Sequence, residues 1–386
     1  MTIWVVAGEP SGDARAFELV SALRVRRSDI SFCGAGGPRL QTLAQPPFDN
    51  WIERSAVVGL WDVLRQYGYF HQKFHSMLRA IRHMQPAAVI LVDYPGFNLR
   101  LAARLRREHF PGKIIQYISP QVWAWNRARI KKMARILDLM VCMFPFEQPM
   151  YEASGLHSVF VGHPLLEALE SEKHPHPRDQ NLVGLFPGSR WREVRRIFPI
   201  QLAAARIISS RSPATRFEVS VTTQHHANWI QNQAGDFPLD VKQGTAHDLM
   251  MRASAGIVCS GTATLEAAFF RLPYCLIYKT AWLTYEIGKR VVDVTHLGII
   301  NILNNYRTNP PPHPGALPNP APPIIREFIQ KGARPAAIAS EVLRLLHQPE
   351  YAAKMQSEFS DILSGLKPHG ASGRAADEIL RCLEEK

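Results

Sequence analysis

The stretch TIWVVAGEPSGD at residues 2–13 decides the fold class. Its first part is an apolar run with the length of a buried strand, and this run closes at Gly8. A helical pattern of apolar residues follows from Ser11 to about Arg27. A strand that leads directly into a helix is one βα unit, and its small-residue turn leaves backbone amides open to a ligand.

The same alternation continues along the chain. Further strands are predicted at 30–33, 87–92, 113–118, 139–143 and 158–161, and after a polar linker at 166–180 a second series follows at 182–186, 217–221, 256–259 and 274–278. Strands that alternate with helices predict parallel sheets covered on both faces. We therefore expect an α/β protein of two Rossmann-like domains that face each other across a cleft, because such sheets bind ligands beyond the carboxyl ends of their strands.

The linker and the composition set the expected domain boundaries. With 386 residues and 46% apolar composition, the chain exceeds what one hydrophobic core usually organises. We expect a first domain over 1–165, a second over 166–345, and C-terminal helices over 346–386 that can return to the first domain. Eight of the fifteen residues at 309–323 are proline, which excludes a helix or a central strand and predicts an exposed loop.

The sequence predicts neither a secretory signal nor a membrane span. The apolar run at 3–7 is short and lacks a preceding basic segment, and no run approaches the roughly 18 apolar residues of a spanning helix. Five widely spaced cysteines without a C-x-x-C pair fit neither a disulfide framework nor a zinc site. These features favour a protein of the reducing cytoplasm.

The positive charge of the chain is concentrated in its first half. The formal charge is +12, and residues 1–163 hold 20 Lys and Arg against 12 Asp and Glu, a difference of +8. A basic surface attracts polyanions, either nucleic acid or an anionic lipid leaflet, and an ordinary solvated face is the alternative.

Two turns of the first half hold candidate functional residues. Asp93 ends the apolar strand AAVILVD, where a carboxylate suits a general base that contributes about 10²–10⁴-fold to rate. The alternative is an N-cap for the helix near Phe97. In the turn after the first strand, Ser11 and Asp13 are candidate ligand contacts, with helix capping as the alternative. The G-x-G-x-x-G spacing is absent, so this turn is not a dinucleotide fingerprint.

Two turns of the second half predict a diphosphate site. In PGSR, at 187–190, helix-start amides and Arg190 face an anion, and a guanidinium binds phosphate in bidentate fashion. SGTATLE at 260–266 repeats the plan, and Glu266 can accept from both hydroxyls of a ribose. Each turn alone is a weak signal. Together they assign donor binding to Gly188, Ser189, Arg190, Ser260, Gly261, Thr262 and Glu266.

These motifs carry a family resemblance. They comprise GEPSGD (8–13), GGP (36–38), YISPQVWAW (117–125), PFE (145–147), FVGHPL (160–165), PGSR (187–190) and SGTATLE (260–266). From about residue 3 to 303 the chain resembles the lipid-A-disaccharide synthase family. The resemblance implies a GT-B fold and an inverting transferase without a cofactor. That transferase moves diacylglucosamine from UDP-2,3-diacylglucosamine to the 6-hydroxyl of 2,3-diacylglucosamine 1-phosphate, which yields lipid A disaccharide 1-phosphate and UDP.

The resemblance also assigns roles to residues. Asp93 matches the proposed base and Arg190 the arginine of the donor diphosphate. Lys279 and Asn301 are further donor candidates, although Lys279 can equally be a solvated charge. On the acceptor side the candidates are Glu9, Ser11, Asp13, Gln121 and Trp123, with a core aromatic as the alternative for the tryptophan. No metal ligands are assigned.

The chain departs from the family pattern at two places. Gly96 stands where many members have a second aspartate. The proline-rich segment replaces the usual Gly-Arg-Glu stretch that follows residues 301–303.

A membrane contact is predicted between residues 57 and 81. One apolar stripe at helical spacing suits the core, and a second set, which includes Leu60, Trp61 and Leu64, would be exposed beside basic residues. We expect it to dock on the anionic cytoplasmic face of the inner membrane. The alternative is packing against a neighbouring helix or against another subunit, as in a homodimer.

Other functions need different features. A nucleic-acid binder would not need two phosphate turns, so we expect no nucleic-acid partner. Peptidoglycan glycosyltransferase or UDP-sugar epimerase relatives would keep the fold and change the acceptor, and the resemblance at 117–125 argues against them.

Overall fold

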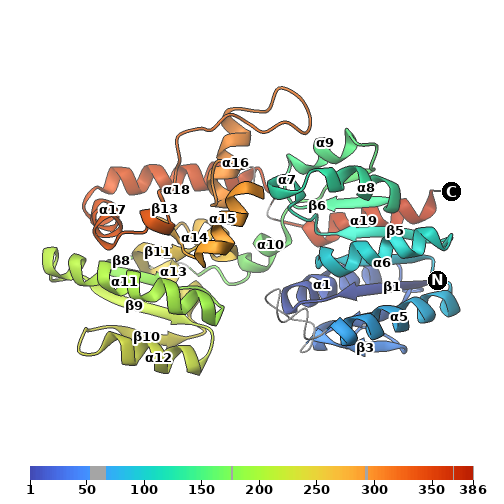
Figure 1. Cartoon of the computed structure of the whole chain (residues 1–386), viewed down its shortest axis with the longest axis horizontal. Coiled ribbons are helices and arrows are strands. Elements are labelled where there is room, and N and C mark those ends of the chain that lie inside the picture. Colours follow the sequence, from blue (N-terminus) through green and yellow to red (C-terminus); the bar gives the residue numbers. More distant parts are fainter. Residues whose placement is uncertain (53–66, 175–176, 292–293, 368, 386) are drawn as a thin grey trace. The chain divides into compact units, whose positions relative to one another are not determined.

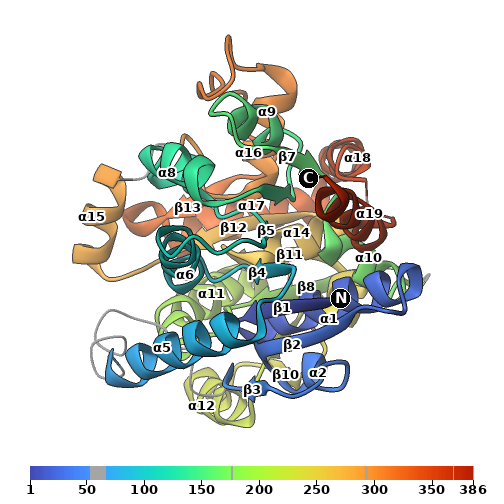
Figure 2. The ribbon, with the colours of Figure 1, turned by 90° about the vertical axis from the view of Figure 1, so that its right-hand side faces the viewer.

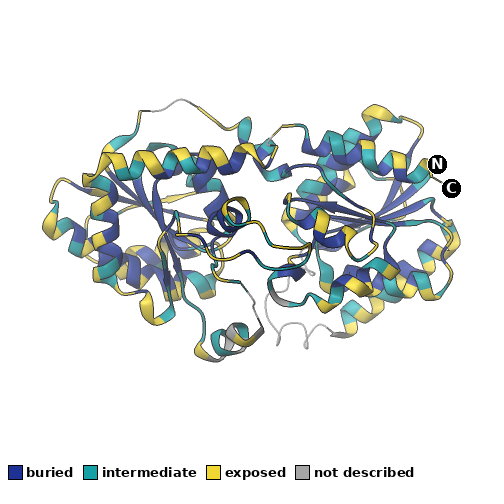
Figure 3. Ribbon diagram, turned by 90° about the horizontal axis from the view of Figure 1, so that it is seen from above, coloured by how far each residue is buried: buried dark blue, intermediate teal, exposed yellow. Residues whose placement is uncertain are grey.

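The computed structural model describes residues 1–52, 67–174, 177–291, 294–367 and 369–385 (Figure 1). The chain forms two compact units. The first holds Met1–Pro164 and Leu366–Lys386, and the second holds Leu165–Gly365. In each unit the central strands are buried and helices expose their outer faces (Figure 3).

The first unit contains a seven-stranded sheet of order β3-β2-β1-β4-β5-β6-β7 with parallel pairs throughout. Its strands are β1 Thr2–Ala7, β2 Ser31–Gly36, β3 Phe48–Asn50, β4 Ala88–Val92, β5 Lys113–Tyr117, β6 Leu139–Cys142 and β7 Ser158–Phe160. The strand order reverses between β1 and β4. The carboxyl ends of these two strands therefore form the switch point at which open parallel sheets bind ligands.

Helices cover both faces of this sheet. They are α1 Pro10–Arg26, α2 Pro38–Gln41, α5 Tyr67–Met84, α6 Pro95–Arg107, α7 Val122–Trp125, α8 Ala128–Ile136, α9 Glu147–Glu152 and α19 Ala371–Glu384. One face carries α1 with α19, and the other carries α5, α6 and α8 (Figure 2). An ion pair between Arg26 and Asp377 ties α19 to α1.

The second unit contains a six-stranded parallel sheet of order β10-β9-β8-β11-β12-β13. Its strands are β8 Asp179–Phe186, β9 Arg216–Val221, β10 Asp240–Gln243, β11 Ala253–Cys259, β12 Tyr274–Tyr278 and β13 Glu327–Ile329. Its helices are α10 Pro164–Glu170, α11 Trp191–Arg211, α12 Gln224–Ala234, α13 Ala246–Arg252, α14 Thr262–Phe269, α15 Trp282–Val291, α16 Ile299–Thr308, α17 Pro335–His347 and α18 Pro349–Ser364, and a 3₁₀ turn, η1, spans Gln330–Gly332.

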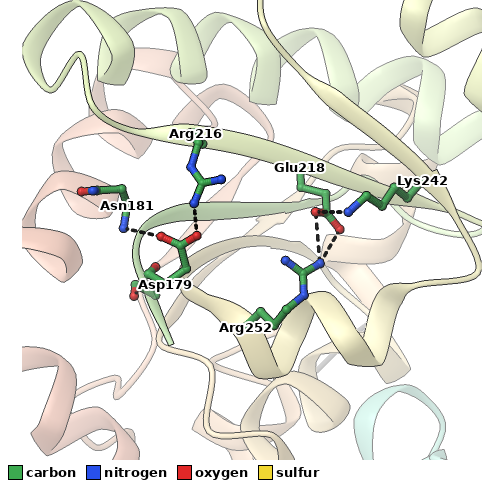
Figure 4. Close-up of polar contacts among 7 residues, drawn as sticks. Asp179, Asn181, Arg216, Glu218, Lys242 and Arg252 are labelled. Carbon is green, nitrogen blue, oxygen red and sulfur yellow. Dashed lines mark hydrogen bonds and ion pairs between the residues drawn. The ribbon is translucent and has the colours of Figure 1, made fainter. Parts of the chain in front are cut away.

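A buried ionic network fixes α13 to this sheet (Figure 4). Glu218 of β9 is 2% exposed and accepts hydrogen bonds from Lys242 of β10, at 2.9 Å, and from Arg252 of α13, at 2.9 and 3.1 Å. At the start of β8, Asp179 pairs with Arg216. A buried carboxylate tolerates burial only when it is fully paired, so the network holds α13 in one position.

The structure corrects several expected boundaries. The predicted linker holds the end of α10, and β8 begins within it at Asp179. The range 346–386 divides between the units, because α18 belongs to the second unit and the chain re-enters the first only at Leu366. Residues 310–323 form neither helix nor strand, as predicted. Within the described residues, no helix is long and apolar enough to cross a bilayer.

Candidate active site

A cavity of about 410 Å³ lies at the carboxyl ends of β8 and β11. These strands are parallel neighbours, with Phe186 paired to Val258, so the turns that follow them meet at one edge of the sheet. The lining includes every donor residue that the two turns predict, namely Gly188, Ser189, Arg190, Ser260, Gly261, Thr262 and Glu266. The structure therefore brings both predicted phosphate turns together.

Glycine is required in both turns. Gly188 has φ 108° and Gly261 has φ 134°, values that favour glycine. A Cβ at Gly188 would lie 2.6 Å from Oε2 of Glu193, whereas a Cβ at Gly261 would meet nothing within 4 Å. The helices α11 and α14 begin directly after these turns, and helix N-termini favour anions.

Arg190 is the exposed cation of this cavity. Its side chain is 57% exposed, and its guanidinium lies 3.2 Å from a carboxylate oxygen of Glu193. The other carboxylate oxygen of Glu193 accepts the backbone N–H of Arg190 at 3.3 Å, which completes a capping box. An exposed ion pair of this kind stabilises the fold little, so the guanidinium can turn to an incoming anion.

His247 of α13 also lines the cavity, and the sequence did not reveal it. Its Nδ1 lies 2.5 Å from Oε2 of Glu172, and its Nε2 lies 3.7 Å from Oε2 of Glu266. The neighbouring carboxylates of Glu266 and Glu172 raise the pKa of His247 to about 9, although burial opposes this. Other lining residues that the sequence did not indicate are Ser220, Thr222, Ala246, Met250 and Cys259.

In the first unit, left-handed backbone gathers at the ends of β4 and β5. Asp93 has φ 49° and Tyr94 has φ 46°, and Ile118 has φ 70°. Non-glycine residues in this region store about 1–3 kcal/mol each, and a β-branched isoleucine is an outlier there. The backbone N–H of Asp93 donates to the carbonyl of Tyr117 at 3.0 Å, so the strained residues adjoin.

Two fully buried carboxamides hold this strained turn. Nε2 of Gln116 lies 3.2 Å from the carbonyl oxygens of both Asp93 and Ile118. Nδ2 of Asn98 donates to the carbonyl of Asp93 at 2.8 Å. We did not predict either residue, although a glutamine within the apolar strand IIQY is a visible signal. Both side chains fix the backbone from which the Asp93 carboxylate projects.

The surroundings of Asp93 make its carboxylate more basic. Burial, and then the negative charge of Glu9, raise the pKa of Asp93, while the backbone N–H of Tyr94 partly offsets them. The turns after β1 and β4 touch, because a Cβ at Gly8 would lie 2.4 Å from the ring of Tyr94. The N-cap of α6 is Tyr94, so the alternative of Asp93 as a helix cap is wrong.

Two predicted acceptor contacts lie in the interior. Asp13 is 2% exposed, and its carboxylate accepts the backbone N–H groups of Gly37, at 2.7 Å, Arg39, at 3.0 Å, and Leu40, at 3.2 Å. It therefore caps α2 and joins GEPSGD to GGP. Trp123 is 1% exposed and donates its indole N–H to Glu147 at 2.9 Å. The structure favours the alternative for each residue, which is helix capping for Asp13, although of α2 and not of the helix that contains it, and a core aromatic for Trp123. Ser11 and Gln121 are exposed and Glu9 is half-buried.

Glu147 explains why two of the motifs lie together. Its fully buried carboxylate accepts from Ser119 and Trp123, and from the backbone N–H groups of Met143, at 3.1 Å, and Phe144, at 3.0 Å. Burial raises the pKa of Glu147 to about 7, against these hydrogen bonds. The carboxylate thereby joins the YISPQVWAW and PFE segments.

Comparison with known proteins decides the family. A sequence model of the family described as lipid-A-disaccharide synthetase matches residues 3–316. The chain belongs to the lipid-A-disaccharide synthase family. The family resemblance of the motifs is thereby confirmed, and the chain is a UDP-sugar glycosyltransferase of lipid A biosynthesis.

Named relatives match over nearly their whole length. The lipid-A-disaccharide synthase of Geobacter sulfurreducens is 37% identical over 395 residues, which cover 99% of this chain and 97% of that protein. That of Syntrophus aciditrophicus is 35% identical over 399 residues, with 99% and 98% covered.

Solved structures of other proteins share the fold. A putative UDP-N-acetylglucosamine 2-epimerase from Listeria monocytogenes has a TM-score of 0.63 at 12% identity, over 100% of this chain and 97% of that one. UDP-GlcNAc 2-epimerase from Neisseria meningitidis, bound to UDP-GlcNAc, has a TM-score of 0.60 at 10% identity, over 98% and 99%. Two parallel-sheet domains of the GT-B class are thereby confirmed, and the cleft between them stays a prediction.

Two remaining donor candidates of this family member lie elsewhere. Lys279 is half-buried after β12 and is not among the described residues that line the cavity. Asn301 is 1% exposed, and both polar atoms of its side chain bind the segment after the proline-rich loop, at Ile324, Ile325 and Glu327. These contacts argue against Asn301 as a donor contact, because its amide is already committed.

The predicted membrane contacts and the stripe predicted for the core fall in the same part of the chain, between residues 57 and 81. Leu60, Trp61 and Leu64 lie outside the described residues. Phe74, Met77 and Ile81 belong to the apolar stripe that is predicted to face the core. Met77 and Ile81 are buried, and Phe74 packs on Phe97 with 5.7 Å between ring centroids. No group of three His, Cys, Asp or Glu side chains suited to a metal occurs among the residues that the structure describes.

Proposed function

We propose that this chain transfers 2,3-diacylglucosamine from UDP-2,3-diacylglucosamine to the 6-hydroxyl of 2,3-diacylglucosamine 1-phosphate, with inversion. The observation that carries the proposal is the cavity at the ends of β8 and β11, where two glycine turns, two helix N-termini and Arg190 converge. Such a constellation suits a nucleoside diphosphate.

The donor would lie in this cavity. The amides of the two turns and Arg190 would bind the diphosphate, and Glu266 would accept from the ribose hydroxyls. As the C1–O bond of the donor breaks, the electron pair passes to the β-phosphate oxygen of UDP. Preorganised donors around that oxygen stabilise the developing charge. Lys279 remains a candidate for a second cation.

The acceptor hydroxyl would meet Asp93. The carboxylate takes the proton of the 6-hydroxyl while the oxygen attacks C1 from the face opposite the leaving UDP, which gives a β-1′,6 bond. A base in a half-buried site with a raised pKa suits this task, since a more basic carboxylate accepts the proton more readily. Glu9, Ser11 and Gln121 are the acceptor-side residues that remain available to a ligand.

We further propose that the enzyme works at the cytoplasmic face of the inner membrane, where its acylated substrates reside. Docking through Leu60, Trp61 and Leu64, and a homodimer, remain predictions. Replacing the three residues together by serine should lower co-sedimentation with anionic vesicles.

The direct test is product formation. Purified protein with both lipid substrates should yield a disaccharide 1-phosphate by mass spectrometry and release one UDP per disaccharide. Nucleic-acid binding with a steep salt dependence and no thermal stabilisation by UDP would favour the nucleic-acid alternative instead. Release of UDP with a product that contains only the donor sugar, and not the acceptor sugar, would contradict the proposed acceptor.

A further inference from the structure

We propose that His247 is a positioning residue that sets the ribose specificity of the donor cavity, by holding Glu266 in the orientation that accepts the ribose hydroxyls. The inference rests on the proposed donor function of the same cavity. It assigns a role to a side chain that none of the sequence motifs contains.

Three elements bring the participating side chains together. Glu172 follows α10, His247 lies in α13 and Glu266 lies in α14. The imidazole lies between the two carboxylates, 2.5 Å from Glu172 and 3.7 Å from Glu266. Nδ1 lies within hydrogen-bonding distance of Glu172 and Nε2 lies at ion-pair distance from Glu266, and a ring placed between two carboxylates is favoured in its charged form, the imidazolium. The pKa of His247, raised to about 9, agrees with that state at neutral pH.

The position of the imidazole is fixed before any ligand arrives. The Glu218 network anchors α13 through Arg252, and Leu249 and Met250 of the same helix are buried. The ring also packs against Phe270, with 5.2 Å between centroids. His247 therefore presents Nε2 to Glu266 from a rigid support, as specific sites require.

The contact with His247 determines which oxygen of the Glu266 carboxylate is available to accept hydrogen bonds from a ligand. Nε2 faces Oε2, which leaves Oε1 to accept from hydroxyl groups. The Glu266 side chain is 18% exposed and lies in the same cavity as Arg190. Without the imidazolium, the carboxylate would be free to turn toward that guanidinium. The hydroxyl acceptor would then be lost, and the diphosphate cation would be partly neutralised.

The other charges around the imidazole do not supply this role. Glu172 is 51% exposed and balances the imidazolium from outside the cavity. Arg190 and Glu193 line the same cavity and pair with each other. On the helix of His247, Asp248 accepts from Arg252 at 2.8 Å. The ion-pair contact between Nε2 of His247 and Oε2 of Glu266, at 3.7 Å, therefore links this carboxylate to the wall that α13 forms.

The test compares UDP with 2′-deoxy-UDP by calorimetry on the full chain. Wild type should bind UDP about tenfold more tightly than the deoxy analogue, the size of one hydrogen bond to a charged group. Glu266→Gln and His247→Ala should both reduce this ratio toward one. Arg190→Ala is the matched control, because it should weaken both ligands by a similar factor and keep the ratio.

Measuring the ratio of the affinities for UDP and 2′-deoxy-UDP over a range of pH distinguishes the effect of the charge of His247 from the effect of its size and shape. In wild type the ratio should fall as the pH rises through about 9, because the imidazolium deprotonates there. His247→Gln, which carries no titrating group, should show a ratio that does not change over this range. Thermal unfolding of each variant identifies general misfolding, which would weaken both ligands together.

The outcomes distinguish the two proposals. If wild type binds neither nucleotide, the proposed donor function fails, and this inference fails with it. If Glu266→Gln loses the discrimination and a folded His247→Ala keeps it, the donor function stands and the role of His247 is wrong. A wild-type ratio near one would likewise overturn the inference while leaving UDP binding intact.

Discussion

The two units both place their motifs after the carboxyl ends of parallel strands, and use them differently. In the first unit, motif side chains bind the protein itself: Asp13 caps α2, and Glu147 accepts from Trp123 and from backbone amides. In the second unit, the motif turns line a cavity, and Arg190 is 57% exposed. The first set of motifs shapes a scaffold, whereas the second presents groups to a ligand.

The chemistry of each proposed task accounts for this difference. A diphosphate carries several acceptor oxygens and needs many donors, which open glycine turns provide with little side-chain involvement. A general base is a single carboxylate whose direction and pKa must both be set. In the first unit, polar side chains therefore form hydrogen bonds with the strained backbone around Asp93, Tyr94 and Ile118.

Asp93→Asn should produce the largest effect and tests the proposed base directly. The amide is nearly isosteric but cannot accept the hydroxyl proton, so transfer should fall by about 10² or more. UDP binding, which we propose for the cavity of the other unit, should not change. Steady-state rates and calorimetry measure the two properties. Asp29→Asn, in an exposed pair with Arg27, is the matched control, and a rate above about a tenth of wild type for Asp93→Asn would refute the base.

How far the sequence determines the fold can be seen in individual strands. The central strands were predicted closely, for example 87–92 against the observed Ala88–Val92, because a buried parallel strand is a continuous apolar run. The strands β3, β10 and β13 were missed. They are short edge strands with polar residues, such as DVKQ, and their pairing depends on the neighbouring strand rather than on their own pattern.

The site residues that could be predicted are those whose positions depend on strand order and not on tertiary packing. The seven donor residues came together because two turns on adjacent strands must meet. His247 was not predicted, because its partner Glu172 is 75 residues away and the contact depends on how α13 packs. Asp13 and Trp123 were placed on the acceptor side because a motif does not show which way a side chain points. Their burial is a property of tertiary packing.

Arg190→Ala should have the next largest effect. It tests the second unit, in which the motif turns line a cavity. Loss of a charge-assisted contact to the diphosphate should weaken UDP binding by about 1.5–3 kcal/mol. The fold should be retained, because the guanidinium is exposed and its pair with Glu193 contributes little. Calorimetry with UDP is the measurement, and Arg196→Ala, exposed on the same helix, is the control. Unchanged affinity would remove Arg190 from the donor site.

Gln116→Leu tests whether the first unit's internal hydrogen bonds serve Asp93. The change removes the donor that reaches the carbonyls of Asp93 and Ile118, so the strained turn should relax. We expect a loss of about 1–3 kcal/mol in the free energy of unfolding and a fall in kcat of about tenfold, since buried carbonyls lose their partner. UDP affinity should stay at its wild-type value. Unchanged kcat in a destabilised variant would mean that Gln116 supports the fold alone.

Glu9→Gln should give the smallest effect and tests the electrostatic part of the base. The negative charge of Glu9 helps to raise the pKa of Asp93, so removing it should lower that pKa. Asp93 must be ionised to accept a proton, and the acidic limb of kcat/KM against pH should therefore move to lower pH. One charge at this range in a half-buried site corresponds to roughly half a pH unit.

The raised pKa of Asp93 also determines whether the free energy of unfolding rises or falls with pH. Asp93 binds its proton more tightly in the folded state, so the free energy of unfolding falls as the pH rises from the unfolded pKa through the folded one. In Glu9→Gln this fall should be smaller, because the folded pKa lies nearer the unfolded value. Glu384→Gln, with a side chain 72% exposed on α19, is the control and should leave the acidic limb in place. A limb that moves to higher pH in Glu9→Gln would mean that Glu9 lowers the pKa of the proton acceptor, and the proposed coupling would be wrong.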